Sequence, residues 1–305
     1  MMATGWLRGI AAAALIGTAG WAGATDNAVE HGTGRFPAML EERADLPDHV
    51  VYRPRDMAAL GRAKLGIYVF GNGGCGADGT ASRNHLLEIA SHGYLVIASG
   101  TIPKPADVKT KASTPGGALQ VATATHLLSD AIDWAVRENG RADSPFRDRI
   151  ATDEIAVSGW SCGGLQALAV AAEPRVKTSV IMNSGFFPAG ANPIPDIVSD
   201  KTLLKRLHGS TLYILGGPSD IAHGNGTDDF GRIAHIPAAL VNIPVGHGGT
   251  YMQPHGGVAA EVVTAWLDWQ LKGDAKARQR FVGADCGYCR DPRLTLDRNA
   301  LLQKR

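Results

Sequence analysis

Ser161 lies in the segment Gly159-Trp160-Ser161-Cys162-Gly163, which matches the pattern G-x-S-x-G. The apolar run 155–157 leads almost directly into this segment, so the serine is expected on a sharp turn from a strand into a helix. The flanking glycines let neighbouring backbone pack closely, and the N-terminal N–H groups of the helix point at charge that develops beside the hydroxyl. The pattern predicts a nucleophilic serine. Because the chain has 38 glycines, the pattern alone is weak evidence and needs a base, an acid and an oxyanion site.

His247 is the best candidate for the base that a serine hydroxyl requires. It follows the apolar run 239–243 in a glycine-flanked loop, which can carry an imidazole back over the end of a sheet. The alternative role for this residue is that of a solvent-facing loop side chain. His255 is the second choice, since it lies closer to the last long helix. His85 and His92 fall on a predicted helix, where a core or surface role is expected.

Asp220 is the candidate acid that would orient the base and stabilise the imidazolium. It lies just past the apolar run 211–215, between Ser161 and His247 in the sequence. Two other aspartates, Asp228 and Asp229, lie further along the same glycine-rich segment and are alternatives. Loop aspartates often only cap a turn, but the position of Asp220 after a predicted strand favours the catalytic role.

An oxyanion site is expected where two backbone N–H groups meet beside the serine. One donor is the residue after the nucleophile, Cys162, and the other is expected in a loop after an early strand. The apolar run 66–70 leads into the glycine-rich segment 71–76, where Gly74 is the preferred donor and Cys75 the second choice. A plain glycine turn is the alternative. A phosphate-binding loop is disfavoured because the segment fits G-x-G-x-x-G poorly and has no Walker lysine.

The four cysteines favour two disulfides in an oxidising compartment. Amides that converge on one oxygen bring their residues close together, so we predict a Cys75–Cys162 bond between the oxyanion loop and the nucleophile turn. Two reduced, buried thiols are the alternative. Cys286 and Cys289 are expected to close a small loop. Zinc is disfavoured because a C-x-x-C site needs a second pair of ligands, and a redox role because this motif follows the last predicted helix.

Residues 1–24 have the organisation of a secretory signal peptide. Arg8 is their only charged side chain, a small apolar stretch follows over 10–21, and Ala22-Gly23-Ala24 is a suitable cleavage site. A buried N-terminal helix is the alternative, and the stretch is too short for a membrane span. We therefore expect a mature chain of residues 25–305 that is secreted or periplasmic, without a membrane span after cleavage.

The composition is that of a globular protein with material for a substantial core, with 45% hydrophobic and 19% charged residues. The chain has 30 basic and 29 acidic residues, and signal cleavage would remove Arg8 alone, which leaves a neutral protein. This balance, together with the absence of a dense Lys/Arg run, argues against a nucleic-acid partner and against steering of a charged one.

The elements that would position these residues alternate along the chain. Strands are expected at 49–53, 66–70, 94–99, 154–157, 176–182, 211–215 and 239–243. Helices are expected at 82–92, 120–139, 163–172 and 257–271. This alternation predicts an α/β fold, a mostly parallel sheet with helices on both faces in a single domain over 25–305, with a short Cys-containing tail. The segments 100–118 and 183–200 are rich in Pro and Gly and are expected to be loops that shape the site.

With Ser161, Asp220 and His247 in this order and the glycine-rich loop 71–75 before them, the chain resembles the α/β-hydrolase superfamily over roughly residues 50–271. It looks most like the compact, lid-less branch of dienelactone hydrolases, bacterial cutinases and polyester hydrolases. The Gly-Trp-Ser-x-Gly-Gly turn resembles that of the last group. The resemblance implies a serine hydrolase that works through an acyl-enzyme, without metal or cofactor. The chain departs from polyester hydrolases in its oxyanion loop, where Gly-Asn-Gly-Gly-Cys replaces a segment that typically presents an aromatic residue.

The expected function is a secreted hydrolase of carboxylic esters, with a small-molecule or polymeric ester as substrate. Trp160 would flank the acyl or alcohol pocket, and ordinary packing beside the turn is the equal alternative. Two other functions fit the same residues. One is a secreted amidase or peptidase with the same triad, and the other is a non-catalytic binding or envelope protein on a hydrolase scaffold.

Overall fold

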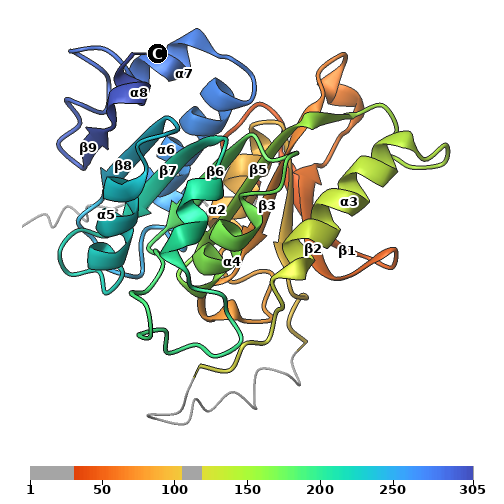
Figure 1. Ribbon diagram of the computed structural model, residues 1–305. Coiled ribbons are helices and arrows are strands. Elements are labelled where there is room, and N and C mark those ends of the chain that lie inside the picture. The colour runs from red at the N-terminus through yellow and green to blue at the C-terminus, as the bar shows by residue number, and fades with distance from the viewer. Residues whose placement is uncertain (1–30, 105–118, 305) are drawn as a thin grey trace, which may run out of the picture.

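The central element of the protein is a nine-stranded sheet, seen in a computed structural model that describes residues 31–104 and 119–304 (Figure 1). The predicted signal peptide and most of the predicted loop 100–118 lie outside the described residues. The strands are β1 (Ala38–Arg43), β2 (Leu46–Pro54), β3 (Leu65–Gly71), β4 (Tyr94–Ser99), β5 (Ile150–Trp160), β6 (Thr178–Met182), β7 (Ser210–Leu215), β8 (Ala238–Asn242) and β9 (Thr295–Arg298).

The strand order is β1-β2-β4-β3-β5-β6-β7-β8-β9. Neighbouring strands from β4 to β8 in this order pair in parallel, whereas the β1–β2, β2–β4 and β8–β9 pairs are antiparallel. All seven predicted strands are present, and the predicted α/β architecture with a mostly parallel sheet is confirmed. The edge strands β1 and β9 were not predicted, because their residues are only partly buried and lack a continuous apolar run.

The α-helices are α2 (Arg83–Ser91), α3 (His126–Gly140), α4 (Cys162–Val170), α5 (His223–Arg232), α6 (Gly257–Gln270), α7 (Ala275–Phe281) and α8 (Ala300–Gln303). The four predicted helices are confirmed. However, α3 begins later than expected because the N–H groups of Ala122 and Thr123 bond to the Cys75 carbonyl instead of entering the helix. Within residues 31–104 and 119–304, none of the helices has the length and apolar character needed to cross a membrane.

The prediction of a glycine-rich loop through Asp228 and Asp229 is wrong, because α5 occupies this segment. One glycine of this helix, Gly226, has a structural role. A side chain there would meet the Ser184 carbonyl and the Leu215 side chain at 2.7 Å, so a glycine lets α5 pack against the sheet.

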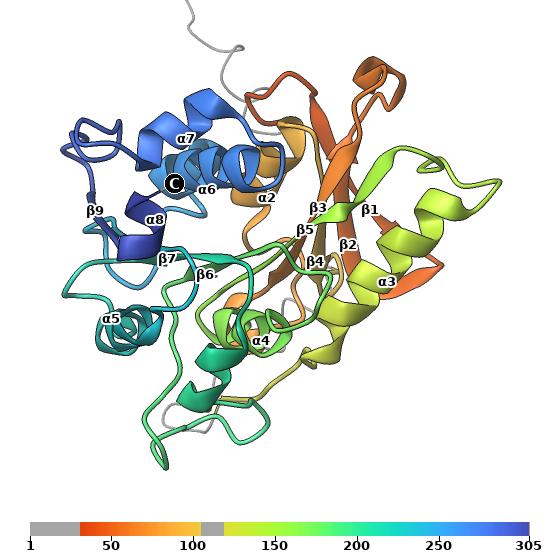
Figure 2. The same ribbon diagram turned by 45° about the horizontal axis from the view of Figure 1, so that its top comes forward.

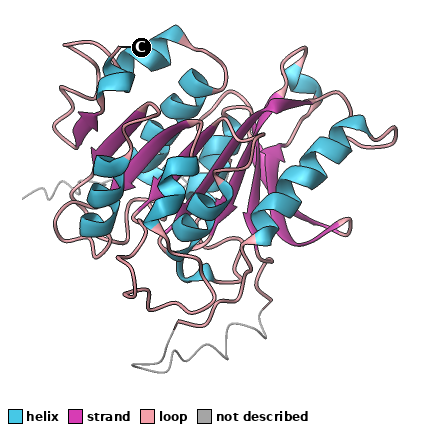
Figure 3. Cartoon of the chain, in the orientation of Figure 1, coloured by secondary structure: helices cyan, strands magenta, loops and turns pink. Residues whose placement is uncertain are grey.

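Helices cover the sheet in two layers, with α3, α4 and α5 on one face and α2, α6 and α7 on the other (Figure 2). The alternation of side chains along β3 supplies both layers. Ile67 and Val69 join the core beneath α3 and α4, whereas Tyr68 and Phe70 join the core beneath α2 and α6. The carboxyl ends of the parallel strands meet at one edge, where the long loops gather at the bottom of Figure 3.

Candidate active site

Ser161 occupies the turn between β5 and α4, as the sequence predicts. Its backbone has φ +55° and ψ −119°, a conformation that a residue other than glycine rarely adopts. The Ser161 N–H donates to the Met182 carbonyl (2.9 Å), and the Ser184 hydroxyl donates to the Ser161 carbonyl (2.7 Å). Gly163 makes the turn possible, because a Cβ there would lie 2.0 Å from the Gly71 carbonyl oxygen. The nucleophile turn therefore packs directly against the end of β3.

Ser161, His247 and Asp220 form one continuous hydrogen-bonded chain. The Ser161 Oγ lies 2.9 Å from His247 Nε2, and His247 Nδ1 lies 2.6 Å from Asp220 Oδ1. An ionised Asp220 can only accept, so Nδ1 carries the proton and Nε2 accepts from the serine hydroxyl. Asp220 is fully buried, while the His247 side chain is 26% exposed. The imidazole can therefore reach both the serine and a ligand from solvent.

The environment of Asp220 favours its ionised form. Burial alone would raise its pKa, but hydrogen bonds outweigh this effect and hold the pKa below its usual value. His247 supplies one of these bonds, the N–H groups of Ala222 and Gly216 each donate at 2.9 Å, and the side chain of Asn183 donates at 2.7 Å. A carboxylate held in this way can orient an imidazole without taking its proton.

The alternative acids are engaged elsewhere. Asp228 forms ion pairs with Lys201 and Arg232, both at 2.9 Å. Asp229 is buried, pairs with Lys201 and accepts from the Phe186 N–H (2.7 Å). These contacts assign both aspartates to the attachment of α5 and of the loop that begins at Phe186.

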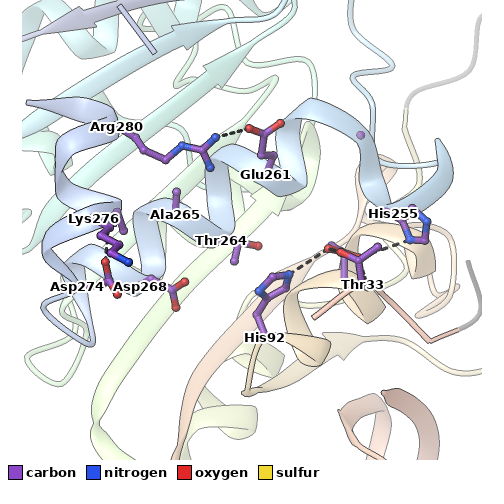
Figure 4. Close-up of a pocket in the computed structure, with 13 residues that line it drawn as sticks. Thr33, His92, His255, Glu261, Thr264, Ala265, Asp268, Asp274, Lys276 and Arg280 are labelled. Atoms are coloured by element: carbon purple, nitrogen blue, oxygen red, sulfur yellow. Dashed lines mark hydrogen bonds and ion pairs between the residues drawn. The ribbon is translucent and has the colours of Figure 1, made fainter. Parts of the chain in front are cut away.

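The second-choice base, His255, lies in a different cavity, of about 520 Å³, between α2, α6 and α7 (Figure 4). Its Nδ1 is 3.6 Å from the Glu88 carboxylate, too far for a hydrogen bond. That carboxylate accepts from the Thr33 backbone N–H (2.8 Å) and lies 3.1 Å from His92 Nε2. Burial would raise the pKa of Glu88, but its hydrogen bonds with His92 and Thr33 lower it. His255 therefore belongs to a polar cluster apart from Ser161.

The two predicted oxyanion donors lie on segments joined by a disulfide. Cys75 and Cys162 are bonded, with their Cα atoms 5.2 Å apart, in agreement with the predicted pairing. The Cys75 N–H is engaged with the Asn72 carbonyl (3.1 Å), whereas the Gly74 N–H has no acceptor within the described residues. Cys162 is the first residue of α4, so its N–H has no partner inside the helix. The role of Gly74 and Cys162 as oxyanion donors stays a prediction.

The other cysteines, Cys286 and Cys289, are also bonded, with their Cα atoms 5.1 Å apart. They close a small local loop after α7, as predicted. Among the residues that the structure describes, no group of three or more His, Cys, Asp or Glu side chains is arranged to hold a metal ion.

Trp160 packs beneath the loop that carries His247. Its indole N–H donates to the His247 carbonyl (2.9 Å), and its ring centroid lies 5.7 Å from that of Tyr251. A Cβ at Gly73 would lie 2.2 Å from the Trp160 ring, so the backbone of the 71–76 segment packs directly against the indole. These contacts are those of packing, and the substrate-binding role of Trp160 stays a prediction.

A small cavity of about 80 Å³ opens directly beside Ser161 and His247. Its walls are mainly apolar and come from α4, α5 and the loop after β6. They include Leu165, Phe187, Ile194 and Ala222. Ile221 stands at this cavity with 82% of its surface exposed. The cavity can accept a short apolar group attached to a carbon that lies near the serine hydroxyl.

No protein-family model matches the chain, and a search of the curated proteins finds no match.

Sequence reasoning missed three residues that contact the predicted ones. Asn183 and Ser184 follow β6 directly, and Tyr251 lies in the loop that carries His247. The position of Asn183 and Ser184 at the carboxyl end of the strand next to β5 is the signal that could have found them. Tyr251 had no comparable signal.

Proposed function

We propose that the protein is a serine hydrolase of the α/β-hydrolase type that cleaves carboxylic esters. The observation that carries this proposal is the continuous chain from Ser161 Oγ to His247 and on to the buried Asp220, with a small apolar cavity open at the serine. The strained backbone of Ser161 at the start of α4 supports the same function, because such strain gathers at functional sites.

In the proposed mechanism, the Ser161 Oγ attacks the ester carbonyl while His247 Nε2 takes the hydroxyl proton. Asp220 holds the imidazole and stabilises its protonated form. The N–H groups of Gly74 and Cys162 bind the oxygen that becomes negative. His247 then gives its proton to the leaving alcohol, and a water molecule activated by His247 releases the acid from the acyl-enzyme.

The cavity of about 80 Å³ supports an ester with a short acyl chain. At about 10–15 Å³ per water-sized group, it has room for a chain of only a few carbon atoms. The two disulfides support a secreted or periplasmic location, since such bonds persist in oxidising compartments.

Labelling with a fluorophosphonate probe tests the proposal. We expect the probe to attach to Ser161 in the oxidised full chain, to be located there by peptide mass mapping, and to be absent from Ser161→Ala. A non-catalytic binding protein would not be labelled at all. Matched ester and amide substrates with the same acyl group then separate an esterase from an amidase, and faster turnover of the amide would overturn the ester assignment.

A further inference from the structure

Asn183 is a buried polar residue at the centre of the candidate site. It directly follows β6, is 1% exposed, and has φ +45°, in the left-handed region. Its backbone N–H donates to the Ile214 carbonyl at the end of β7 (2.7 Å). The backbone is thereby fixed between two strands, and the side chain extends from a position that favours glycine.

The side-chain amide of Asn183 holds three groups of the site together. Its Nδ2 donates to Asp220 Oδ2 (2.7 Å) and lies 3.3 Å from the Gly246 carbonyl, next to His247. Its Oδ1 accepts from the hydroxyl of Tyr251. Because the Tyr251 hydroxyl occupies the acceptor end of the amide, the donor end must face Asp220.

Tyr251 is itself held rigidly, which makes it a suitable anchor. It is fully buried, and its ring contacts Trp160 (5.7 Å between centroids) and His85 (5.6 Å). Burial raises the pKa of Tyr251 well above 10, so its hydroxyl keeps the proton that it donates to Asn183.

We infer that Asn183, oriented by Tyr251, is a positioning residue that fixes the second oxygen of Asp220 and thereby tunes the serine–histidine pair for hydrolysis. The inference rests on the proposed function. His247 binds Oδ1 of Asp220, whereas Oδ2 accepts from Asn183 (2.7 Å) and from the Gly216 N–H (2.9 Å), so the carboxylate is held against rotation away from the imidazole. A bond that stabilises the carboxylate also limits how strongly it attracts a proton on the imidazole.

The pH profile of ester hydrolysis separates this role from a purely structural one. The titratable groups around the amide are Asp220 and His247, with Tyr251 and, behind it, His85 on α2. His223, on the first turn of α5, contacts Asp220 through the backbone, where its N–H donates to the Asp220 carbonyl (2.9 Å). Burial lowers the pKa of His85 to about 3, so neither it nor Tyr251 changes charge between about pH 5 and pH 9.

Asn183→Gly is the decisive variant, because glycine accepts the left-handed backbone and removes only the amide. We expect kcat/KM to fall roughly 10- to 100-fold, the loss typical of a hydrogen bond to a charged group. We also expect the acid limb of kcat/KM to move upward by about one pH unit, because a carboxylate that has lost its side-chain donor but keeps the Gly216 and Ala222 N–H groups holds a protonated imidazole more tightly.

Asn299→Gly is the matched control, since it removes an asparagine amide that makes four hydrogen bonds at the start of α8, away from the site. It should lower the stability of the protein and leave the acid limb unmoved. Tyr251→Phe is a second test variant, for which we expect a smaller upward shift of the acid limb of kcat/KM. It replaces Asn183→Gly as the test if that variant fails to fold, and an unmoved acid limb would then contradict the inference.

Two results would overturn the inference while leaving the proposed function intact. One is a folded Asn183→Gly protein with kcat/KM within about threefold of the parent, and the other is a lower kcat/KM with an unmoved acid limb. By contrast, a parent protein that a fluorophosphonate does not label would refute the proposed function, and the inference with it.

Discussion

Removal of the Cys75–Cys162 disulfide should destabilise the protein far more than removal of the Cys286–Cys289 disulfide. The first bond joins residues separated by 87 positions and the second joins residues separated by 3. A cross-link lowers the entropy of the unfolded chain, and this effect grows with the logarithm of the loop length. The bond that closes the long loop therefore adds about 4.5 kcal/mol to the free energy of unfolding, and the bond that closes the short loop adds about 2 kcal/mol. The double variants C75A/C162A and C286A/C289A form a matched pair for this comparison.

Urea unfolding of the two variants and the parent, followed by tryptophan fluorescence, measures these free energies. The activity of C75A/C162A should also fall at temperatures where it remains folded. The disulfide holds the loop of Gly74 to the turn of Cys162, and loss of one oxyanion donor lowers kcat by about 100-fold or more. We expect a smaller loss here, up to about 100-fold, since the loop is loosened and not removed. The reasoning is refuted if C75A/C162A lies within about 1 kcal/mol of the parent and keeps its kcat/KM.

Three further results follow from the site and its surroundings. Ser161→Ala should lower kcat/KM about a million-fold and Asp220→Asn about ten-thousand-fold, in steady-state assays of ester hydrolysis; a loss below tenfold for either would contradict the assigned role. Ile194→Ala should enlarge the cavity beside the serine and raise kcat/KM for long acyl chains relative to short ones by roughly 10- to 100-fold, measured on an ester ladder. Burial lowers the pKa of His85 from 6.5 to about 3, so unfolded chains take up a proton that folded ones refuse, and stability falls as the pH drops below about 6.5. When the pH is lowered from about 7 to 4.5, the free energy of unfolding of His85→Gln, measured by urea titration, should fall by about 3 kcal/mol less than that of the parent. Equal decreases in the two proteins would show that His85 is not the group responsible.

The parallel strands and the order of the site residues were readable from the sequence because both leave strong local patterns. Fully buried strands such as β3 and β7 are continuous apolar runs, and residues after such runs share one edge of the sheet. This is why Asp220 and His247 could be chosen among many aspartates and histidines before any contact was known.

What could not be predicted depends on contacts between distant segments. The helix α5 contains three glycines and forms because Gly226 packs against β7 and because Asp229 is held by Lys201. The bond from Asn183 to Asp220 depends on the exact end of β6, a strand that begins with polar residues although Thr178 and Ser179 are buried. Local propensity carries no information on either.

The two disulfides join cysteines that are consecutive along the chain, Cys75 with Cys162 and Cys286 with Cys289. Four cysteines allow more than one pairing, but in a chain that enters an oxidising compartment N-terminus first, each native partner is also the next cysteine to arrive. For a chain exported as proposed above, the order of arrival therefore favours the native pairs. Cys162 would find Cys75 while the segments that carry Asp220 and His247 are still emerging. The oxyanion loop and the nucleophile turn would thus be joined before the rest of the site exists.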